Sequence, residues 1–87
     1  MKYFAVFLQM KDEELSKQYR PEHLVYLEKL RNEGKIYANG RFVDGWGGLV
    51  IYKAETLEEA KILAEEDPIV KVGARHCQIH EWELVIA

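Results

Sequence analysis

The sequence predicts an α+β fold in which six segments follow one another in the order strand, helix, strand, strand, helix, strand. Two observations support this order. Four short segments are apolar on one or both alternating faces, as strands are, and two longer segments carry apolar residues three and four positions apart, as helices do. Because 87 residues provide only one modest core, we expect a single domain over residues 1–87.

The first strand is predicted over residues 2–10. A polar segment follows at residues 11–19, with room for one or two turns of helix. Both alternating faces of the first strand are apolar, one with Phe4, Val6 and Leu8 and the other with Tyr3, Ala5 and Phe7. We therefore expect this strand to be covered by other groups on both sides.

The main helix is expected to begin at Pro21, since proline fits the first turn of a helix, and to end at Gly34. His23 then lies on the apolar side of the helix with Tyr26, so it points toward the sheet rather than toward water. In an alternative arrangement, residues 13–19 are helical as well, and Pro21 marks a kink in a longer helix.

The second strand is predicted over residues 36–43, a glycine-rich hairpin connection over residues 44–48, and the third strand over residues 49–52. A second helix begins at Thr56, which forms a capping-box pattern with Glu59. It ends before Asp67-Pro68, because the residue that precedes a proline is disfavoured in the helical region. A connection then leads to the last strand, residues 76–86.

Two right-handed crossovers place the first and third strands side by side in the centre of a four-stranded antiparallel sheet, with both helices on one face. This is a ferredoxin-like βαββαβ sandwich. Its other face is left bare, although the first strand and residues 49–52 are apolar on both sides. We therefore expect a homodimer in which a second copy packs sheet to sheet.

The composition excludes several classes of partner. The net charge is −3 and the charged residues are interspersed, so there is no basic stripe for nucleic acid. The apolar run at the N-terminus lacks a small-residue cleavage site and is too short to span a bilayer. We expect a cytoplasmic protein that binds neither nucleic acid nor membrane.

We expect no metal ion and no organic cofactor. His76 and His80 lie in one strand about 13 Å apart, too far for one metal ion. The glycines of residues 44–48 lack the lysine and the helix start of a phosphate-binding loop. The single cysteine, Cys77, is predicted to be a small buried hydrophobic residue.

Three short motifs together resemble the YciI-like family. The resemblance covers nearly the whole chain and implies a ferredoxin-like domain that forms a dimeric α+β barrel, with an active site centred on a histidine and an aspartate. The motifs are Arg20-Pro21-Glu22-His23-Leu24, Asp67-Pro68 with Gly73 downstream, and Ile79-His80-Glu81-Trp82. The chain departs from the family at Arg41 and Glu81, where proline is common, and at Ile69, where an aromatic residue is common.

This resemblance implies that His23 and Asp67 are catalytic and that Arg20 binds substrate. A carboxylate that accepts the proton of one imidazole nitrogen leaves the other nitrogen free to take a proton from a substrate. The resulting hypothesis is a small cofactor-independent lyase or isomerase that acts on a small oxygenated aromatic or unsaturated acid. The alternative is a non-catalytic dimeric module that binds a small ligand or a protein partner, with His23 structural.

The partner of His23 depends on where the main helix begins. If the helix begins at Pro21, His23 and Asp67 are separated by about 16 Å along the helix, and Asp44 in the hairpin is the competing partner. If the helix is longer, His23 lies near its middle and closer to Asp67. The resemblance favours Asp67.

Overall fold

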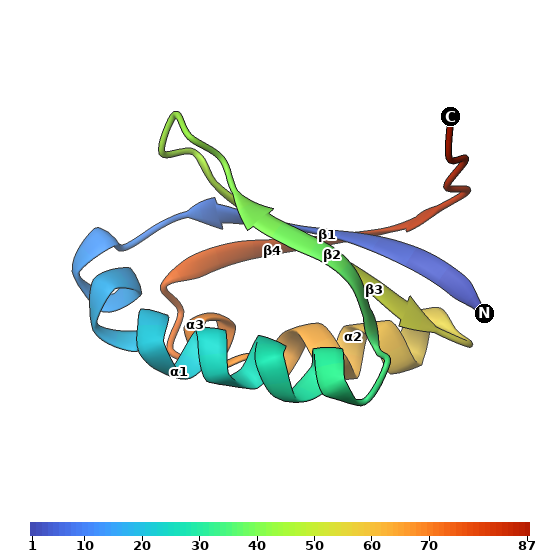
Figure 1. Cartoon of the computed structure of the whole chain (residues 1–87). Coiled ribbons are helices and arrows are strands. Elements are labelled where there is room, and N and C mark those ends of the chain that lie inside the picture. Colours follow the sequence, from blue (N-terminus) through green and yellow to red (C-terminus); the bar gives the residue numbers. More distant parts are fainter.

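The computed structural model describes residues 1–87 and has the predicted ferredoxin-like α+β architecture, with one additional short helix (Figure 1). The order of elements along the chain is β1 (Lys2–Met10), α1 (Glu13–Asn32), β2 (Ile36–Arg41), β3 (Gly47–Ala54), α2 (Leu57–Glu65), α3 (Pro68–Lys71) and β4 (Arg75–Trp82).

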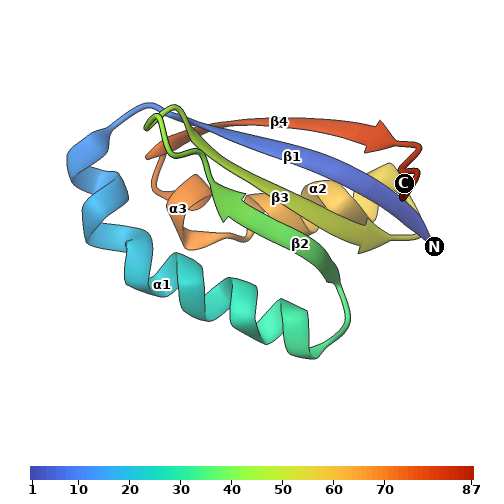
Figure 2. The same ribbon diagram turned by 45° about the horizontal axis from the view of Figure 1, so that its top comes forward.

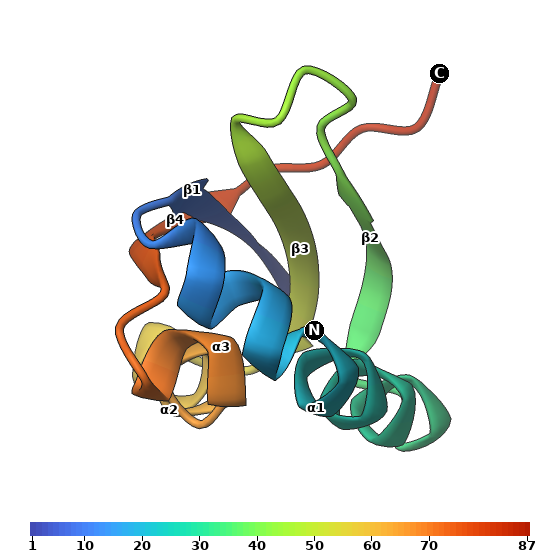
Figure 3. The same ribbon diagram turned by 90° about the vertical axis from the view of Figure 1, so that its left-hand side faces the viewer.

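The four strands form one antiparallel sheet in the order β2-β3-β1-β4. The first and third strands are therefore central neighbours, as predicted, with Ala5 of β1 opposite Ile51 of β3 and His80 of β4. All three helices lie on the same side of the sheet (Figure 3). The opposite side of the sheet carries no helix.

The core fills the space between the sheet and the helices. On β1, Phe4, Val6 and Leu8 face the helices and are almost completely buried, so Tyr3 and Phe7 belong to the open face of the sheet. The other almost completely buried apolar residues come from every remaining element except β4, and include Leu27, Leu30, Ile36, Val50, Tyr52, Ala60, Ala64 and Ile69.

The main helix begins at Glu13, so the prediction that it begins at Pro21 was wrong. Asp12 supplies a start signal of its own, because its carboxylate accepts a hydrogen bond of 3.1 Å from the backbone N–H of Leu15. Pro21 lies inside the helix, where its ring removes one backbone hydrogen bond. The first turns of α1 run in a different direction from the rest of the helix (Figure 2). His23 consequently lies near the middle of a 20-residue helix.

The second helix begins as predicted, with the Thr56 hydroxyl accepting a hydrogen bond of 3.2 Å from the N–H of Glu59. The single helical turn that follows it, α3, was not predicted from the sequence. Asp67 caps this turn by accepting a 3.1 Å hydrogen bond from the N–H of Ile69, and Pro68 occupies the first helical position. The turn places the Asp67 side chain against α1.

The ends of three strands differ from the prediction. β2 stops at Arg41, β3 extends from Gly47 to Ala54, and β4 stops at Trp82. Cys77 is exposed rather than buried, because β4 is an edge strand that the helices cover incompletely. No helix of the chain is both long enough and apolar enough to cross a membrane.

Candidate active site

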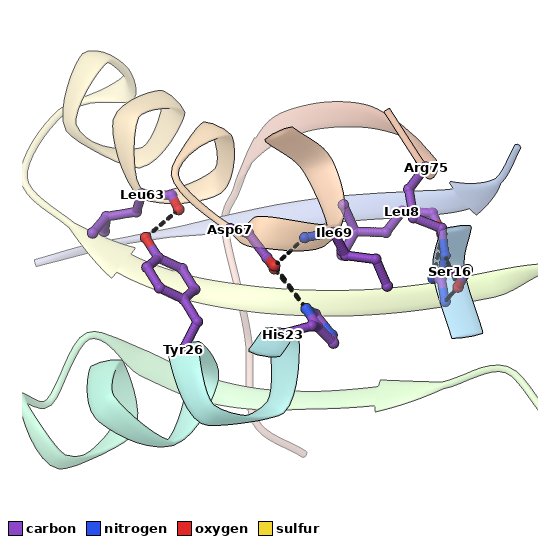
Figure 4. A network of polar contacts seen from close by, with 8 residues as sticks. All are labelled: Leu8, Ser16, His23, Tyr26, Leu63, Asp67, Ile69 and Arg75. Carbon is purple, nitrogen blue, oxygen red and sulfur yellow. Dashed lines mark hydrogen bonds and ion pairs between the residues drawn. The ribbon is translucent and has the colours of Figure 1, made fainter. Parts of the chain in front are cut away.

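His23 and Asp67 form a direct contact between α1 and the start of α3. The Nδ1 atom of His23 lies 2.7 Å from Oδ2 and 2.9 Å from Oδ1 of Asp67 (Figure 4). An ionised carboxylate only accepts hydrogen bonds, so Nδ1 carries the proton and donates it. The Nε2 atom is left without a protein partner, which makes it available to a ligand.

Asp67 is held firmly in this position. Its side chain is 1% exposed, and its Oδ1 also accepts the hydrogen bond from the N–H of Ile69 that caps α3. The His23 side chain keeps 12% of its surface accessible. The aspartate therefore orients the imidazole from the protein interior, while the imidazole itself reaches solvent.

Tyr26, one turn beyond His23 on α1, ties the same region to α2. Its hydroxyl donates a 2.6 Å hydrogen bond to the carbonyl oxygen of Leu63 (Figure 4). Burial, followed by the negative charge of Asp67, raises the pKa of Tyr26 to about 12. The phenol therefore remains a hydrogen-bond donor throughout the neutral range and fixes the distance between the two helices.

A small pocket opens beside His23, between α1 and the ends of β2 and β3. It has a volume of about 120 Å³, and its walls include Leu24 and Leu27 on α1. Three guanidinium groups, those of Arg20, Arg41 and Arg75, also line it. The pocket contains no carboxylate of its own, so its electrostatic character is cationic.

The structure brings together the three site residues that the sequence pointed to. His23 and Asp67 are in contact, and Arg20 lines the pocket with His23. Asp44, the competing partner, lies elsewhere: it is exposed in the β2–β3 hairpin and accepts a hydrogen bond of 2.9 Å from the N–H of Trp46.

Neither Arg75 nor Ser16 was predicted from the sequence to be a site residue. The Ser16 hydroxyl accepts hydrogen bonds of 3.1 Å from Nε and 2.8 Å from Nη2 of Arg75, and the Leu8 carbonyl accepts one of 3.2 Å from Nη1. The one available signal was Ser16 itself, a small polar residue one position after Leu15 in a segment that was predicted to hold at most one or two turns of helix unless the main helix was longer. Its burial, with 4% of its surface exposed, depends on the helix starting at Glu13.

A second, larger cavity lies on the open face of the sheet. It has a volume of about 410 Å³ and is lined by Phe7, Phe42, Asp44, Trp46 and Gln78. The Trp46 ring meets Phe7 and Phe42 edge to face. This cavity contains neither His23 nor an arginine, and no three His, Cys, Asp or Glu side chains converge anywhere in the chain to hold a metal ion.

The fold and the site define a ferredoxin-like domain with a histidine–aspartate pair beside a small cationic pocket. The chain belongs to the YCII-related domain family, whose model matches residues 1–83. The uncharacterised protein YjpA of Bacillus subtilis (strain 168) is 32% identical over 82 residues, which are 94% of this chain and 96% of that protein.

Among solved structures, the chain is similar to the 5-chloro-2-hydroxyhydroquinone dehydrochlorinase TftG of Burkholderia phenoliruptrix AC1100, in complex with 2,5-dihydroxybenzoquinone. The two structures superpose with a TM-score of 0.79 over 93% of each chain, at 25% sequence identity. The similarity therefore covers nearly the whole chain.

Proposed function

We propose that this protein is a small cofactor-independent enzyme of the lyase or isomerase type. In this proposal His23 is the general base, Asp67 orients it, and Arg20 binds substrate. The substrate is a small oxygenated aromatic or unsaturated acid. One observation carries the proposal: Nδ1 of His23 is engaged by a buried carboxylate, while the same ring lines a pocket with its Nε2 unpartnered.

The chemistry follows from this geometry. The Nε2 atom takes a proton from a C–H or O–H bond of the substrate, and the electron pair of that bond either expels a leaving group or shifts a double bond. The Asp67 carboxylate stabilises the imidazolium that forms, because it already accepts the Nδ1 proton at 2.7 Å. The proton then passes from Nε2 to the product or to water, so no redox cofactor is needed.

The similarity to a dehydrochlorinase supports this reaction class. That protein is solved with a dihydroxylated quinone, a small oxygenated ring, in its complex. Loss of hydrogen chloride is an elimination, which begins with removal of a proton by a base, the step proposed for His23. In this chain Arg20, Arg41 and Arg75 all line the pocket, which favours a substrate that carries negative charge on its oxygen atoms.

We also propose that the protein is a homodimer that pairs through the open face of the sheet. Tyr3, Phe7 and Trp82 project from this face, and Trp82 keeps 44% of its surface exposed. The 410 Å³ cavity around Trp46 lies on the same side. A second copy that buried about 1,600 Å² in total would cover this apolar surface.

Proton abstraction can be tested without knowing the physiological substrate. The protein is incubated in D₂O with a panel of hydroxylated benzoquinones, 5-chloro-2-hydroxyhydroquinone and small unsaturated acids, and NMR follows exchange of C–H for C–D and release of chloride. His23→Asn keeps a donor near Asp67 but removes the base, so turnover should fall by about 10²-fold or more.

His76→Asn is the matched control, since His76 is exposed on β4 and outside the pocket. It should retain the activity of the unchanged protein. Unreduced turnover in His23→Asn would contradict the proposal. If no compound reacts, but ligands bind beside His23 equally well in His23→Asn, the chain is the non-catalytic binding module instead.

A further inference from the structure

The three arginines that line the small pocket have no acidic partners. The five ion pairs of the chain involve Lys2, Arg31, Lys35, Lys71 and His23, and none involves Arg20, Arg41 or Arg75. This is unusual in a chain whose net charge is −3, where carboxylates outnumber basic side chains. Guanidinium groups gathered without carboxylates create a strongly positive local field.

Of the three arginines, Arg75 makes the most hydrogen bonds to the protein. Its hydrogen bonds to the Ser16 hydroxyl and the Leu8 carbonyl use Nε–H, one N–H of Nη1 and one N–H of Nη2 (Figure 4). A guanidinium carries five N–H groups, so one N–H remains on each terminal nitrogen. Both acceptors are neutral, so neither of them compensates the positive charge.

The charge on Arg75 is maintained at an energetic disadvantage. Burial and the nearby positive charge of Arg20 lower the pKa of the Arg75 guanidinium, while Asp67 acts in the opposite direction. An arginine nevertheless stays protonated in proteins. An anion placed between Arg20 and Arg75 would relieve their mutual repulsion, so the pocket favours a negatively charged occupant.

Two glycines contribute backbone to the wall of the pocket opposite α1. Gly48 of β3 pairs with Arg41 of β2, and both line the pocket together with Gly40. A Cβ atom at position 48 would lie 3.1 Å from the Gly40 carbonyl oxygen and 3.9 Å from Nη1 of Arg75. A glycine inside a strand often marks a place where a ligand approaches the backbone, and here it keeps open the space beside Arg75.

From this arrangement we propose that Arg75, held by Ser16 and the Leu8 carbonyl, is the anion-binding residue of the pocket, and that its ligand is a compact organic acid whose carboxylate bonds to the two free terminal N–H groups. Arg20 and Arg41 flank the bound carboxylate. The volume of about 120 Å³ suits a molecule of about six non-hydrogen atoms, because a cavity of roughly 150 Å³ takes up benzene.

This inference rests on the proposed function only in placing the reacting end of the acid at His23. It narrows the substrate class to compact carboxylates and adds Arg75 to Arg20 as a residue that recognises them. Carboxylate binding can be measured by itself, so a failure of the catalytic proposal and a failure of this inference give different results.

The probe is crotonate, a four-carbon unsaturated carboxylate, and crotonamide is its neutral isostere. Both are titrated at pH 7.5 and low salt into ¹⁵N-labelled protein, and NMR records the backbone shifts of Gly48 and the Nε–H signal of Arg75. Crotonate should shift both signals in a saturable manner, and crotonamide should bind at least tenfold more weakly.

Arg75→Met removes the charge with little change in length and should weaken crotonate binding about tenfold or more. Arg75→Lys keeps the charge but not the paired donors, so its affinity for crotonate should lie between those of Arg75→Met and the unchanged protein. Lys61→Met, which removes one exposed positive charge on α2, is the control and should bind like the unchanged protein. Gly48→Ala fills the space beside Arg75 without altering charge, and it should also weaken binding.

Equal binding of crotonate and crotonamide, or Arg75→Met binding within twofold of the unchanged protein, would overturn the inference. His23→Asn separates the two proposals. If it abolishes turnover but retains crotonate binding that depends on Arg75, both hold. If crotonate binding depends on Arg75 but no compound is turned over, the catalytic proposal alone is overturned. If compounds are turned over and Arg75→Met does not change that turnover, the proposal that Arg75 binds the carboxylate is overturned alone.

Discussion

The imidazole of His23 and the carboxylate of Asp67 approach within 2.7 Å across 44 residues of sequence. The contact joins the middle of α1 to the first turn of α3, so it is both a structural link between two helices and the centre of the candidate active site. Substitutions of Asp67 can separate two contributions. One is the oxygen that caps α3, which an amide also supplies, and the other is the negative charge that faces His23, which an amide lacks.

Asp67→Asn should retain the cap of α3 but lose the charge-assisted bond to His23. We expect a loss of stability of about 1.5–3 kcal/mol for this change and about 3–5 kcal/mol for Asp67→Ala, which removes both functions. Urea unfolding at pH 7 measures the difference. Asp44→Asn is the matched control and should hardly change the free energy of unfolding. If Asp67→Asn loses no more stability than Asp44→Asn, the pairing of His23 with Asp67 is contradicted.

Tyr26→Phe should change how stability depends on alkaline pH. The pKa of Tyr26 is raised by burial and by Asp67 from 10.0 to about 12, so the folded protein keeps this proton where the unfolded chain has lost it. Its contribution is complete below about pH 10 and declines as the pH rises toward about 12. The variant should therefore be less stable by about 1 kcal/mol at pH 7, and the difference should shrink across this interval.

Urea unfolding of both proteins at several pH values from 7 to 12 tests this prediction. Burial also raises the pKa of Tyr52, whose contribution has the same sign. It is present in both proteins and cancels in the comparison. A stability difference that stays constant with pH would show that the Tyr26 phenol does not titrate as stated.

Gly47 should tolerate no side chain. Its φ of +147° is a conformation that other residues rarely adopt, and an added Cβ would overlap the carbonyl oxygen of Leu8 on the neighbouring strand. Gly47→Ala should cost about 3 kcal/mol or more in thermal or urea unfolding. Gly45→Ala, with a φ of +86° but open space around it, should cost only about 1–2 kcal/mol. Similar losses at both positions would be inconsistent with this packing.

The open face of the sheet should mediate dimer formation. In sedimentation experiments at low micromolar concentration, we expect a species of twice the 10.2 kDa chain mass. Phe7→Glu places a charge on this face and should give monomers or aggregates. Val25→Glu, at a site on α1 that is 70% exposed, should leave the mass unchanged. A purely monomeric unchanged protein would remove the dimer proposal.

Apart from the short helix α3, the kinds of elements and their order were readable from the sequence, because both depend on local patterns. The two-sided apolar run of β1, the Thr56 cap and the proline after Asp67 each act within a few residues. The inward direction of His23 was readable for the same reason, since helical periodicity fixes the face on which a residue lies. Pro21 was misread because the start signal at Asp12 lies nine residues earlier and outweighs it.

Tertiary structure alone decided which side chains meet. The pairing of His23 with Asp67 depends on how far α1 extends along the sheet, and the pairing of Arg75 with Ser16 joins residues 59 positions apart. The same is true of the pocket, because Arg20, Arg41 and Arg75 come from three different elements. Local periodicity determines which face of an element a side chain occupies, but the contacts across elements depend on element lengths and packing, which no short stretch of sequence contains.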